Sequence, residues 1–208
     1  MVKKKKDSNH PQTEQTLVLI KPDGVQRSLI GEIVKRYERS GLKLTGLKMV
    51  LPTGALAEKH YTLDPSWKRK VGEKAIESYL KKGLKPPTND PLVIGNRVLG
   101  NLKKYLSSGP VVAMIWQGAH AVKVVRKITG STEPLSSDVG TIRGDFVIDS
   151  YEMSDTDGRA VRNLIHASGE VGEAKKEIAL WFSKNELFKY RLVHDTILYD
   201  VNLDGILE

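Results

Sequence analysis

Two short runs of apolar residues place the strongest constraint on what this chain can fold into. They are TLVLI at residues 16–20 and VVAMIW at residues 111–116. Neither run alternates apolar with polar side chains, which is typical of central strands that are buried on both faces. Such a strand needs a layer of structure above it and another below it. The rest of the chain is therefore expected to supply helices that cover a sheet.

The segments between these runs carry helical and strand patterns in alternation. Residues 28–40 place Ile30, Ile33, Val34 and Tyr37 on one face, with Ser28 expected to cap the start and Gly41 to end the helix. Residues 42–51 alternate apolar and polar side chains, which predicts a half-buried strand. We expect further helices over residues 55–61, 67–82, 98–107 and 120–128, and a loop where Pro86, Pro87 and Pro91 interrupt the pattern.

This order of elements predicts one domain, an α/β or α+β sandwich with helices over a sheet. The domain is expected to span residues 16–200. Residues 1–15 read as a disordered basic tail, and residues 201–208 as a loosely held C-terminal tail.

Composition excludes several classes of site. With 39% apolar residues among 208 the chain can bury a core, and without cysteine it has neither disulfides nor a thiolate zinc site. No apolar run is long enough to cross a membrane, so no membrane partner is expected. Most of the net charge of +8 lies in the N-terminal lysine run and in residues 66–85, which contain seven basic residues and two glutamates. Such charge attracts nucleic acid, anionic surfaces or phosphorylated small molecules alike.

The stretch RNLIHASGEVGEAKKEIALWF at residues 162–182 is where we expect the chemistry. It reads as a buried strand, a turn, and a helix whose apolar stripe holds Val171, Ala174, Ile178 and Trp181. Glu177 falls on the flank of that stripe, where it would be half buried and point back toward His166. An imidazole whose one nitrogen is held by a carboxylate can attack with the other. On this stretch alone, a core histidine beside a solvated glutamate is about equally favoured.

Basic and hydroxyl side chains at the ends of other elements shift that balance. They are Lys21, Arg126, Thr132, Arg143 and His166. Together with the positive end of the helix after His166 they are typical of a polyphosphate site. The chain has no Walker A motif, kinase glycine loop or HRD motif, so neither a P-loop protein nor a protein kinase is indicated.

Four blocks in this chain resemble nucleoside diphosphate kinases: TLVLIKPDGVQRSLIGEIVKRYE, SGPVVAMIWQG, GTIRGDF and RNLIHASGEVGEAKKEIALWF. The resemblance covers most of residues 16–182 apart from two insertions, near 64–97 and 150–160. It implies a ferredoxin-like βαββαβ fold with an antiparallel sheet covered by helices. It also implies ping-pong transfer of a γ-phosphate, mainly from ATP, to a nucleoside diphosphate.

The resemblance assigns roles to particular residues. His166 would be the nucleophile, with Glu177 orienting its ring and Ser168 supporting that contact. Lys21 would hold the γ-phosphate and a sugar hydroxyl, and Asn163 would bind the 3′-hydroxyl. The remaining expected contacts to the nucleotide come from Arg126, Thr132 and Arg143 on the β- and γ-phosphates and from Tyr61 near the transferred phosphate.

The chain departs from the family pattern at two places. Ala167, Ser168 and Gly169 follow the histidine where the family has Gly-Ser-Asp. The aromatic residue on which the family stacks the base is replaced at the counted position by Val98. We expect Val98 and Leu102 to clamp the base, with Trp67 as an alternative, and the insertion near 150–160 to reshape this side of the cleft.

The resemblance also implies a cofactor and an assembly, while the absence of cysteine suits a reducing compartment. Mg²⁺ is expected to bind mainly through the nucleotide phosphates, with no metal site on the protein itself. A homo-oligomer, tetramer or hexamer, in the cytoplasm is expected. The alternative is a nucleic-acid-binding or regulatory protein of the same fold that uses residues 67–85 and the N-terminal lysines, although solvated helix charges are favoured about three to one for these residues. A scaffold without activity is disfavoured, because it has no need for the whole polar set.

Overall fold

The computed structural model describes residues 13–81, 83, 85–200, 202 and 204. Most of the tail predicted over residues 1–15, including its lysine run, lies outside the described residues, as does most of 201–208. The last residues of the predicted N-terminal tail belong to the fold, since Gln15 begins the first strand. None of the described helices is long and apolar enough to cross a membrane.

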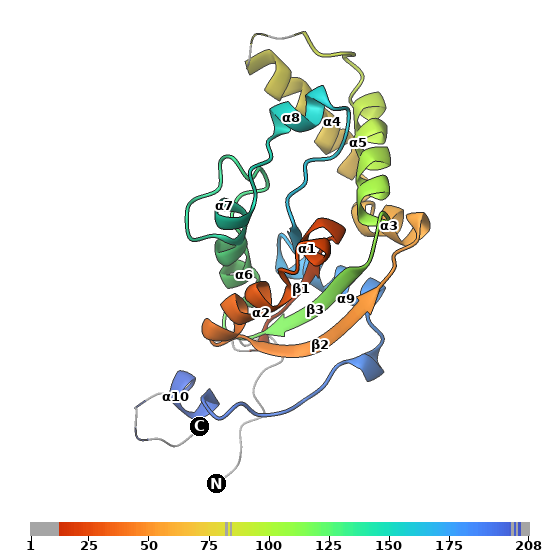
Figure 1. Cartoon of the computed structure of the whole chain (residues 1–208). Coiled ribbons are helices and arrows are strands. Elements are labelled where there is room, and N and C mark those ends of the chain that lie inside the picture. Colours follow the sequence, from red (N-terminus) through yellow and green to blue (C-terminus); the bar gives the residue numbers. More distant parts are fainter. Residues whose placement is uncertain (1–12, 82, 84, 201, 203, 205–208) are drawn as a thin grey trace.

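Four antiparallel strands form the sheet, in the spatial order β2-β3-β1-β4 (Figure 1). They are β1 (Gln15–Ile20), β2 (Lys43–Val50), β3 (Val111–Gln117) and β4 (Ile165–Ala167). The two apolar runs are the central strands β1 and β3, as predicted. This order and direction confirm the expected ferredoxin-like sheet.

Side chains of β1 alternate between two cores, one on each face of the sheet. Val18 and Ile20 pack into a cluster with residues of α2 (Ile30–Arg39) and α6 (Ala121–Thr129). The period of two along a strand sends the next side chains to the opposite face. The sheet is therefore covered on both sides, as a doubly buried strand requires.

The second core lies on the face that carries Leu17 and Leu19. It is covered by α3 (Gly54–Tyr61), α5 (Pro91–Leu106) and α9 (Val171–Trp181). The end of α3, the end of β1, β4 and α9 meet on this side, and they carry His60, Lys21, His166 and Glu177.

A helical pair extends beyond the sheet at the top of Figure 1. Helix α4 (Trp67–Lys81) packs against α5 so closely that a Cβ on Gly72 would lie 1.8 Å from the carbonyl oxygen of Pro91. A Cβ on Gly95 would likewise lie 2.1 Å from the carbonyl oxygen of Lys68. The remaining elements are α1 (Pro22–Gln26), α7 (Ile142–Phe146), α8 (Tyr151–Thr156), the 3-10 helix Lys184–Glu186 and α10 (Asp195–Leu198).

Several local predictions were wrong, each for a local reason. Ser28 does not cap α2: it has a φ of 57° in the turn after α1, and Leu29 precedes the helix. Pro91 does not extend a loop but begins α5, where its missing N–H costs nothing and Asp90 caps the helix. Val171 was predicted to be on the buried stripe of α9, but its side chain is exposed.

Residues 150–160, predicted to be an exposed loop, contain the short helix α8, capped by Ser150. The buried carboxylate of Asp149 holds this segment in place. It accepts hydrogen bonds from both terminal nitrogens of Arg159, at 2.6 and 3.0 Å, and from the backbone N–H of Arg162 at 2.7 Å. Although burial opposes its ionisation, these donors hold the pKa of Asp149 below its usual value.

Candidate active site

A cleft of about 1350 Å³ opens between the α4–α5 pair and the segments that carry α8 and β4. Nine of the ten predicted site residues line it: Lys21, Tyr61, Val98, Arg126, Thr132, Arg143, Asn163, His166 and Glu177. The tenth, Ser168, is fully buried behind Glu177. The fold therefore brings together residues that lie up to 156 positions apart in the chain.

His166 is the central residue of β4 and pairs in register with Leu19 of β1. The chain bends sharply just before it, because Leu164 has a φ of 62°. Two hydrogen bonds hold this bend: the N–H of Leu164 donates to Oδ2 of Asp23 at 3.2 Å, and its carbonyl accepts the N–H of Lys21 at 2.8 Å. Lys21 and the start of α1, directly after β1, therefore fix the backbone that presents His166.

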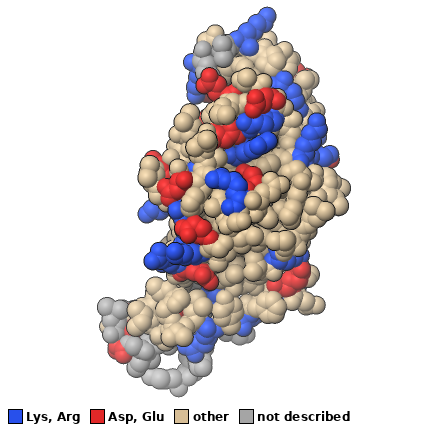
Figure 2. Space-filling model, viewed as in Figure 1, with Lys and Arg blue, Asp and Glu red and all other residues tan. Residues whose placement is uncertain are grey.

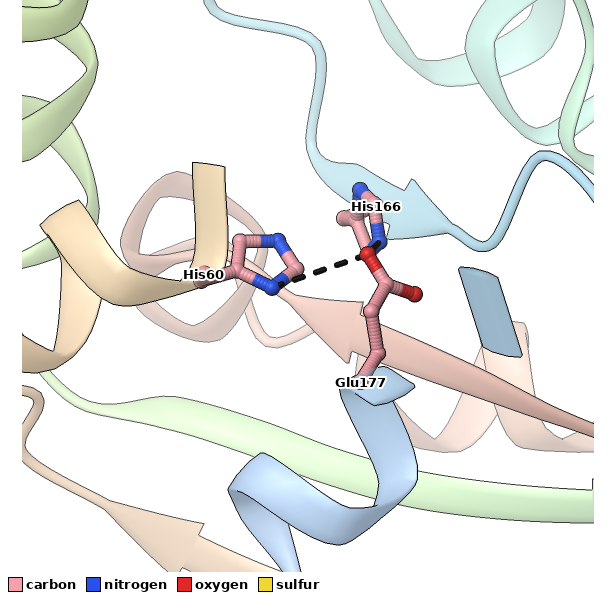
Figure 3. Close-up of side chains that lie close together, drawn as sticks. All are labelled: His60, His166 and Glu177. Carbon is pink, nitrogen blue, oxygen red and sulfur yellow. Dashed lines mark ion pairs between the residues drawn. The ribbon is translucent and has the colours of Figure 1, made fainter. Parts of the chain in front are cut away.

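The carboxylate of Glu177 lies directly under the His166 ring (Figure 3). Its Oε1 is 2.8 Å from Nε2 of His166, and its Oε2 accepts the hydroxyl of Ser168 at 2.5 Å. Ser168 in turn accepts the backbone N–H of Leu17 at 3.2 Å. The other ring nitrogen of His166, Nδ1, points away from Glu177 (Figure 3). This arrangement leaves one imidazole nitrogen free to react.

Glu177 is more deeply buried than the expected half-buried position, with 1% of its surface exposed. Burial disfavours its ionised form, but His166, His60 and the Ser168 hydroxyl together outweigh that effect and hold the pKa of Glu177 below its usual value. The carboxylate is therefore charged beside the His166 ring.

Lys21 lies at the end of β1, buried with 5% of its surface exposed. Its ammonium donates to Oδ1 of Asn163 at 2.7 Å, and the amide of Asn163 donates to the carbonyl of Thr132 at 2.8 Å. Burial, with the nearby charge of Arg143, lowers the pKa of Lys21 to about 7, against the smaller opposing effect of Asp23. Judged from its own position alone, Lys21 was predicted to extend its side chain to solvent. That prediction was wrong, because the side chain is buried.

The two arginines of the site differ. Arg143 is buried and donates to four backbone carbonyls, those of Gly130, Ser131, Asn163 and Ile165. Because a guanidinium has five N–H groups, only one is left for a ligand. Arg126 is exposed at the end of α6 and makes no hydrogen bond within the described part of the chain. Arg126 is thus free to turn toward a bound anion.

Val98 and Trp67 both line the cleft, as do Tyr61 and Leu102. The Trp67 ring lies 5.8 Å from the Tyr61 ring, tilted by 37°. The hydroxyl of Tyr61 is buried without a hydrogen-bond partner. Both the predicted Val98 clamp and its Trp67 alternative thus remain compatible with the cleft.

Sequence reasoning missed one residue of the site, His60. It reaches the site from α3, and its Nδ1 lies 3.6 Å from Oε1 of Glu177 (Figure 3). Nothing in the sequence near residue 60 signals this contact, because it joins elements more than 100 residues apart. The four-residue spacing of Glu177 and Trp181 places both on one face of α9, and Trp181 also contacts His60. This spacing is the only feature of the sequence that hints at the contact.

His60, His166 and Glu177 are the one set of histidine and acidic groups among the described residues with ligand atoms close enough to share a metal ion, all within 4.8 Å. The Nε1–H of Trp181 already donates to Nδ1 of His60, and Nε2 of His166 lies 2.8 Å from Oε1 of Glu177. These side chains therefore suit the positioning of an imidazole better than the binding of an ion.

Charges on the face shown in Figure 2 are mixed. Lysine and arginine gather over its upper half, but acidic side chains lie among them rather than leaving an unbroken basic surface. This pattern does not favour the nucleic-acid-binding alternative.

The family model of nucleoside diphosphate kinase matches residues 14–79 and 94–187. The chain belongs to the nucleoside diphosphate kinase family. The unmatched residues 80–93 fall inside the insertion predicted near 64–97, whereas 150–160 lies within the second matched stretch. Family membership and the enzyme class that it carries, a kinase acting on nucleotides, are thereby confirmed. Members of the family use a divalent metal ion.

Nucleoside diphosphate kinases from distant organisms are similar over most of their length. The Pyrobaculum aerophilum enzyme is 42% identical over 180 residues, which cover 85% of this chain and 98% of the relative. Nucleoside diphosphate kinase A of Mus musculus is 39% identical over 188 residues, 90% of this chain and 98% of the relative.

Solved nucleoside diphosphate kinases share the fold. The crystal structure of the Pyrobaculum aerophilum NDP kinase has a TM-score of 0.81 at 41% identity and covers 85% of this chain and 100% of its own. A Borrelia burgdorferi kinase, a transition-state mimic with vanadate and ADP bound, has a TM-score of 0.74 at 34% identity and covers 89% and 96%.

Proposed function

We propose that this nucleoside diphosphate kinase transfers the γ-phosphate of a nucleoside triphosphate, mainly ATP, to a nucleoside diphosphate through a phosphohistidine on Nδ1 of His166. The observation that carries this proposal is the His166–Glu177 pair. One ring nitrogen lies 2.8 Å from a buried carboxylate, and the other is free beside a cleft lined with cationic groups.

In the first half-reaction the lone pair on Nδ1 of His166 attacks the γ-phosphorus. The bond from the γ-phosphorus to the bridging oxygen breaks, and its electron pair leaves on the β-phosphate of the departing diphosphate. The ring gains positive charge while Nε2 keeps its proton toward Glu177. The ionised carboxylate stabilises that charge, and its bond to Ser168 keeps it from rotating away.

In the second half-reaction a β-phosphate oxygen of the incoming diphosphate attacks the phosphohistidine. The P–N bond breaks and its electron pair returns to Nδ1, which regenerates His166. Because the same groups serve both half-reactions, the site has to hold the departing and the incoming diphosphate in the same orientation.

The remaining cleft residues would bind the nucleotide. Lys21 and Arg126 would neutralise γ- and β-phosphate oxygens, with the hydroxyl of Thr132 and the one unused N–H of Arg143 adding direction. Asn163 would exchange its bond to Lys21 for the sugar hydroxyls, Tyr61 would lie near the transferred phosphate, and Val98 would pack on the base.

Mg²⁺ is the divalent ion that we propose. It would be held mainly by phosphate oxygens of the nucleotide and would neutralise part of their charge. We further propose a homo-oligomer, tetramer or hexamer, in the cytoplasm; sedimentation of the purified chain measures the assembly.

The test is incubation with γ-labelled ATP and Mg²⁺ without an acceptor, followed by acid and base treatment of the protein. We expect an acid-labile, base-stable label that a nucleoside diphosphate discharges. His166→Ala should abolish it, while His194→Ala, an exposed histidine outside the cleft, should label like wild type. Label retained in folded His166→Ala, or no label on folded wild type, would contradict the proposal.

A further inference from the structure

His60 is buried at the end of α3, with 4% of its surface exposed, and touches three parts of the site. Its ring stands edge-on to that of His166, with centroids 4.4 Å apart and planes at 86°. Its Nδ1 accepts the Nε1–H of Trp181 at 3.3 Å and lies 3.6 Å from Oε1 of Glu177. The ring of Trp181 packs edge-on against it as well, at 5.8 Å.

The hydrogen bond from Trp181 decides which nitrogen of the neutral His60 ring carries the proton. A nitrogen that accepts a hydrogen bond carries no proton, so the neutral ring holds its proton on Nε2. Burial, then the neighbouring charges of His166 and Lys21, lower the pKa of His60 to about 3, against the opposing effect of Glu177. Tyr61 is the other titratable group against this ring. His60 therefore stays neutral wherever the enzyme works.

A neutral His60 has two consequences for His166. Its ring packs against the His166 ring and restricts its rotation. Only one orientation of the His166 ring keeps Nε2 on Glu177 and Nδ1 toward the cleft. In addition, because Nδ1 of His60 carries no proton, it cannot donate to Oε1 of Glu177. That oxygen is left to His166 alone.

We propose that His60 is a positioning residue for phosphotransfer: with its Nδ1 kept free of a proton by the hydrogen bond from Trp181, it fixes the His166 ring and reserves Oε1 of Glu177 for His166. This inference rests on the proposed function, in which His166 is the nucleophile. His60 does not touch the substrate in this role; it acts through His166 and Glu177.

Three variants test the role: His60→Phe, Trp181→Phe and the double variant. His60→Phe keeps a ring but removes the acceptor. We expect single-turnover phosphorylation by ATP to slow by roughly tenfold or more, since a small misplacement of a reacting group costs up to about 100-fold. The Kd for ADP, measured by calorimetry, should stay within about twofold.

Trp181→Phe keeps the packing but removes the N–H donor. Nδ1 of His60 can then take up a proton and pair with Oε1 of Glu177, which withdraws that oxygen from His166. We expect the acidic limb of the phosphorylation rate to move to higher pH in this variant. The shift should disappear in the double variant, which has no imidazole at position 60 to titrate.

Melting temperature and the stoichiometry of label per folded chain separate a positioning role from simple unfolding. The proposal is overturned if His60→Phe phosphorylates at the wild-type rate, if its slower rate only matches a smaller folded fraction, or if the acidic limb in Trp181→Phe stays at the wild-type pH. Failure of the proposed function looks different, because wild type and His194→Ala would then also carry no phosphohistidine.

Discussion

The ammonium of Lys21 donates to the side-chain carbonyl of Asn163 at 2.7 Å, although the two residues are 142 positions apart. Both side chains are buried, and Asn163 continues the contact to the carbonyl of Thr132. The end of β1, the approach to β4 and the loop after α6 are thereby joined at the floor of the cleft. The pair holds the lysine in place before any phosphate arrives.

Proton uptake on nucleotide binding follows from the environment of Lys21. Burial lowers its pKa to about 7, so at pH 8 most of the free enzyme carries a neutral amine. A bound phosphate favours the ammonium form and raises that pKa. We expect close to one proton taken up per nucleotide at pH 8, measured by calorimetry in buffers of different ionisation enthalpy. Lys21→Met should lose this uptake, and equal uptake in the variant would contradict the assignment.

The same residue makes stability depend on pH. Its folded pKa of about 7 lies below the ordinary 10.5, so between these values the unfolded chain binds more protons than the folded one. The free energy of unfolding should therefore rise with pH across this window. Urea unfolding at several pH values should show the slope in wild type and a flatter one in Lys21→Met.

Replacement by lysine should affect the melting temperature differently at Arg143 and at Arg126. Arg143→Lys cannot satisfy the four carbonyls that the guanidinium now serves, and buried acceptors left unpaired cost about 1–3 kcal/mol each at most. We expect a clear drop in melting temperature together with lost activity. Arg126→Lys should leave the melting temperature unchanged and mainly raise the nucleotide KM. Equal melting temperatures for the two variants would contradict this distinction.

Glu177 and Ser168 should contribute unequally to catalysis. Glu177→Gln removes the charge that stabilises the ring during transfer, and we expect phosphorylation to slow by roughly 100-fold. Ser168→Ala keeps the carboxylate but frees its Oε2, so about tenfold or less is expected. Single-turnover rates at saturating ATP measure both. A larger loss from Ser168→Ala than from Glu177→Gln would reverse the assigned roles.

Gly72→Ala should destabilise the α4–α5 pair. The added Cβ would lie 1.8 Å from the backbone oxygen of Pro91, so one helix has to move, at a cost of about 1–3 kcal/mol. Gly100, in the middle of α5 with no atom within 4 Å of such a Cβ, is the matched control. Gly100→Ala should raise stability by about 0.5–1 kcal/mol. Chemical unfolding of both variants tests the close crossing, and a neutral Gly72→Ala would contradict it.

Much of the architecture was predictable because local patterns carried it. The apolar runs at residues 16–20 and 111–116 could only be central strands, and the alternation in residues 42–51 indicated a half-buried strand. The predictions that failed concern short segments. Ser28, Pro91 and residues 150–160 each allow two local conformations, and the choice between them depends on particular contacts, such as that of Arg159 with Asp149, which the residue pattern does not reveal.

The sequence by itself determined which chemical groups this protein has and the order in which the elements carry them. His166, Lys21 and the arginines could be named from residue type, position at element ends and resemblance. Only the tertiary structure decided how those groups behave, because burial and partners depend on distant segments. It made Lys21 a buried amine with a lowered pKa, tied Arg143 to four carbonyls, and brought His60 against His166 from an element more than 100 residues away.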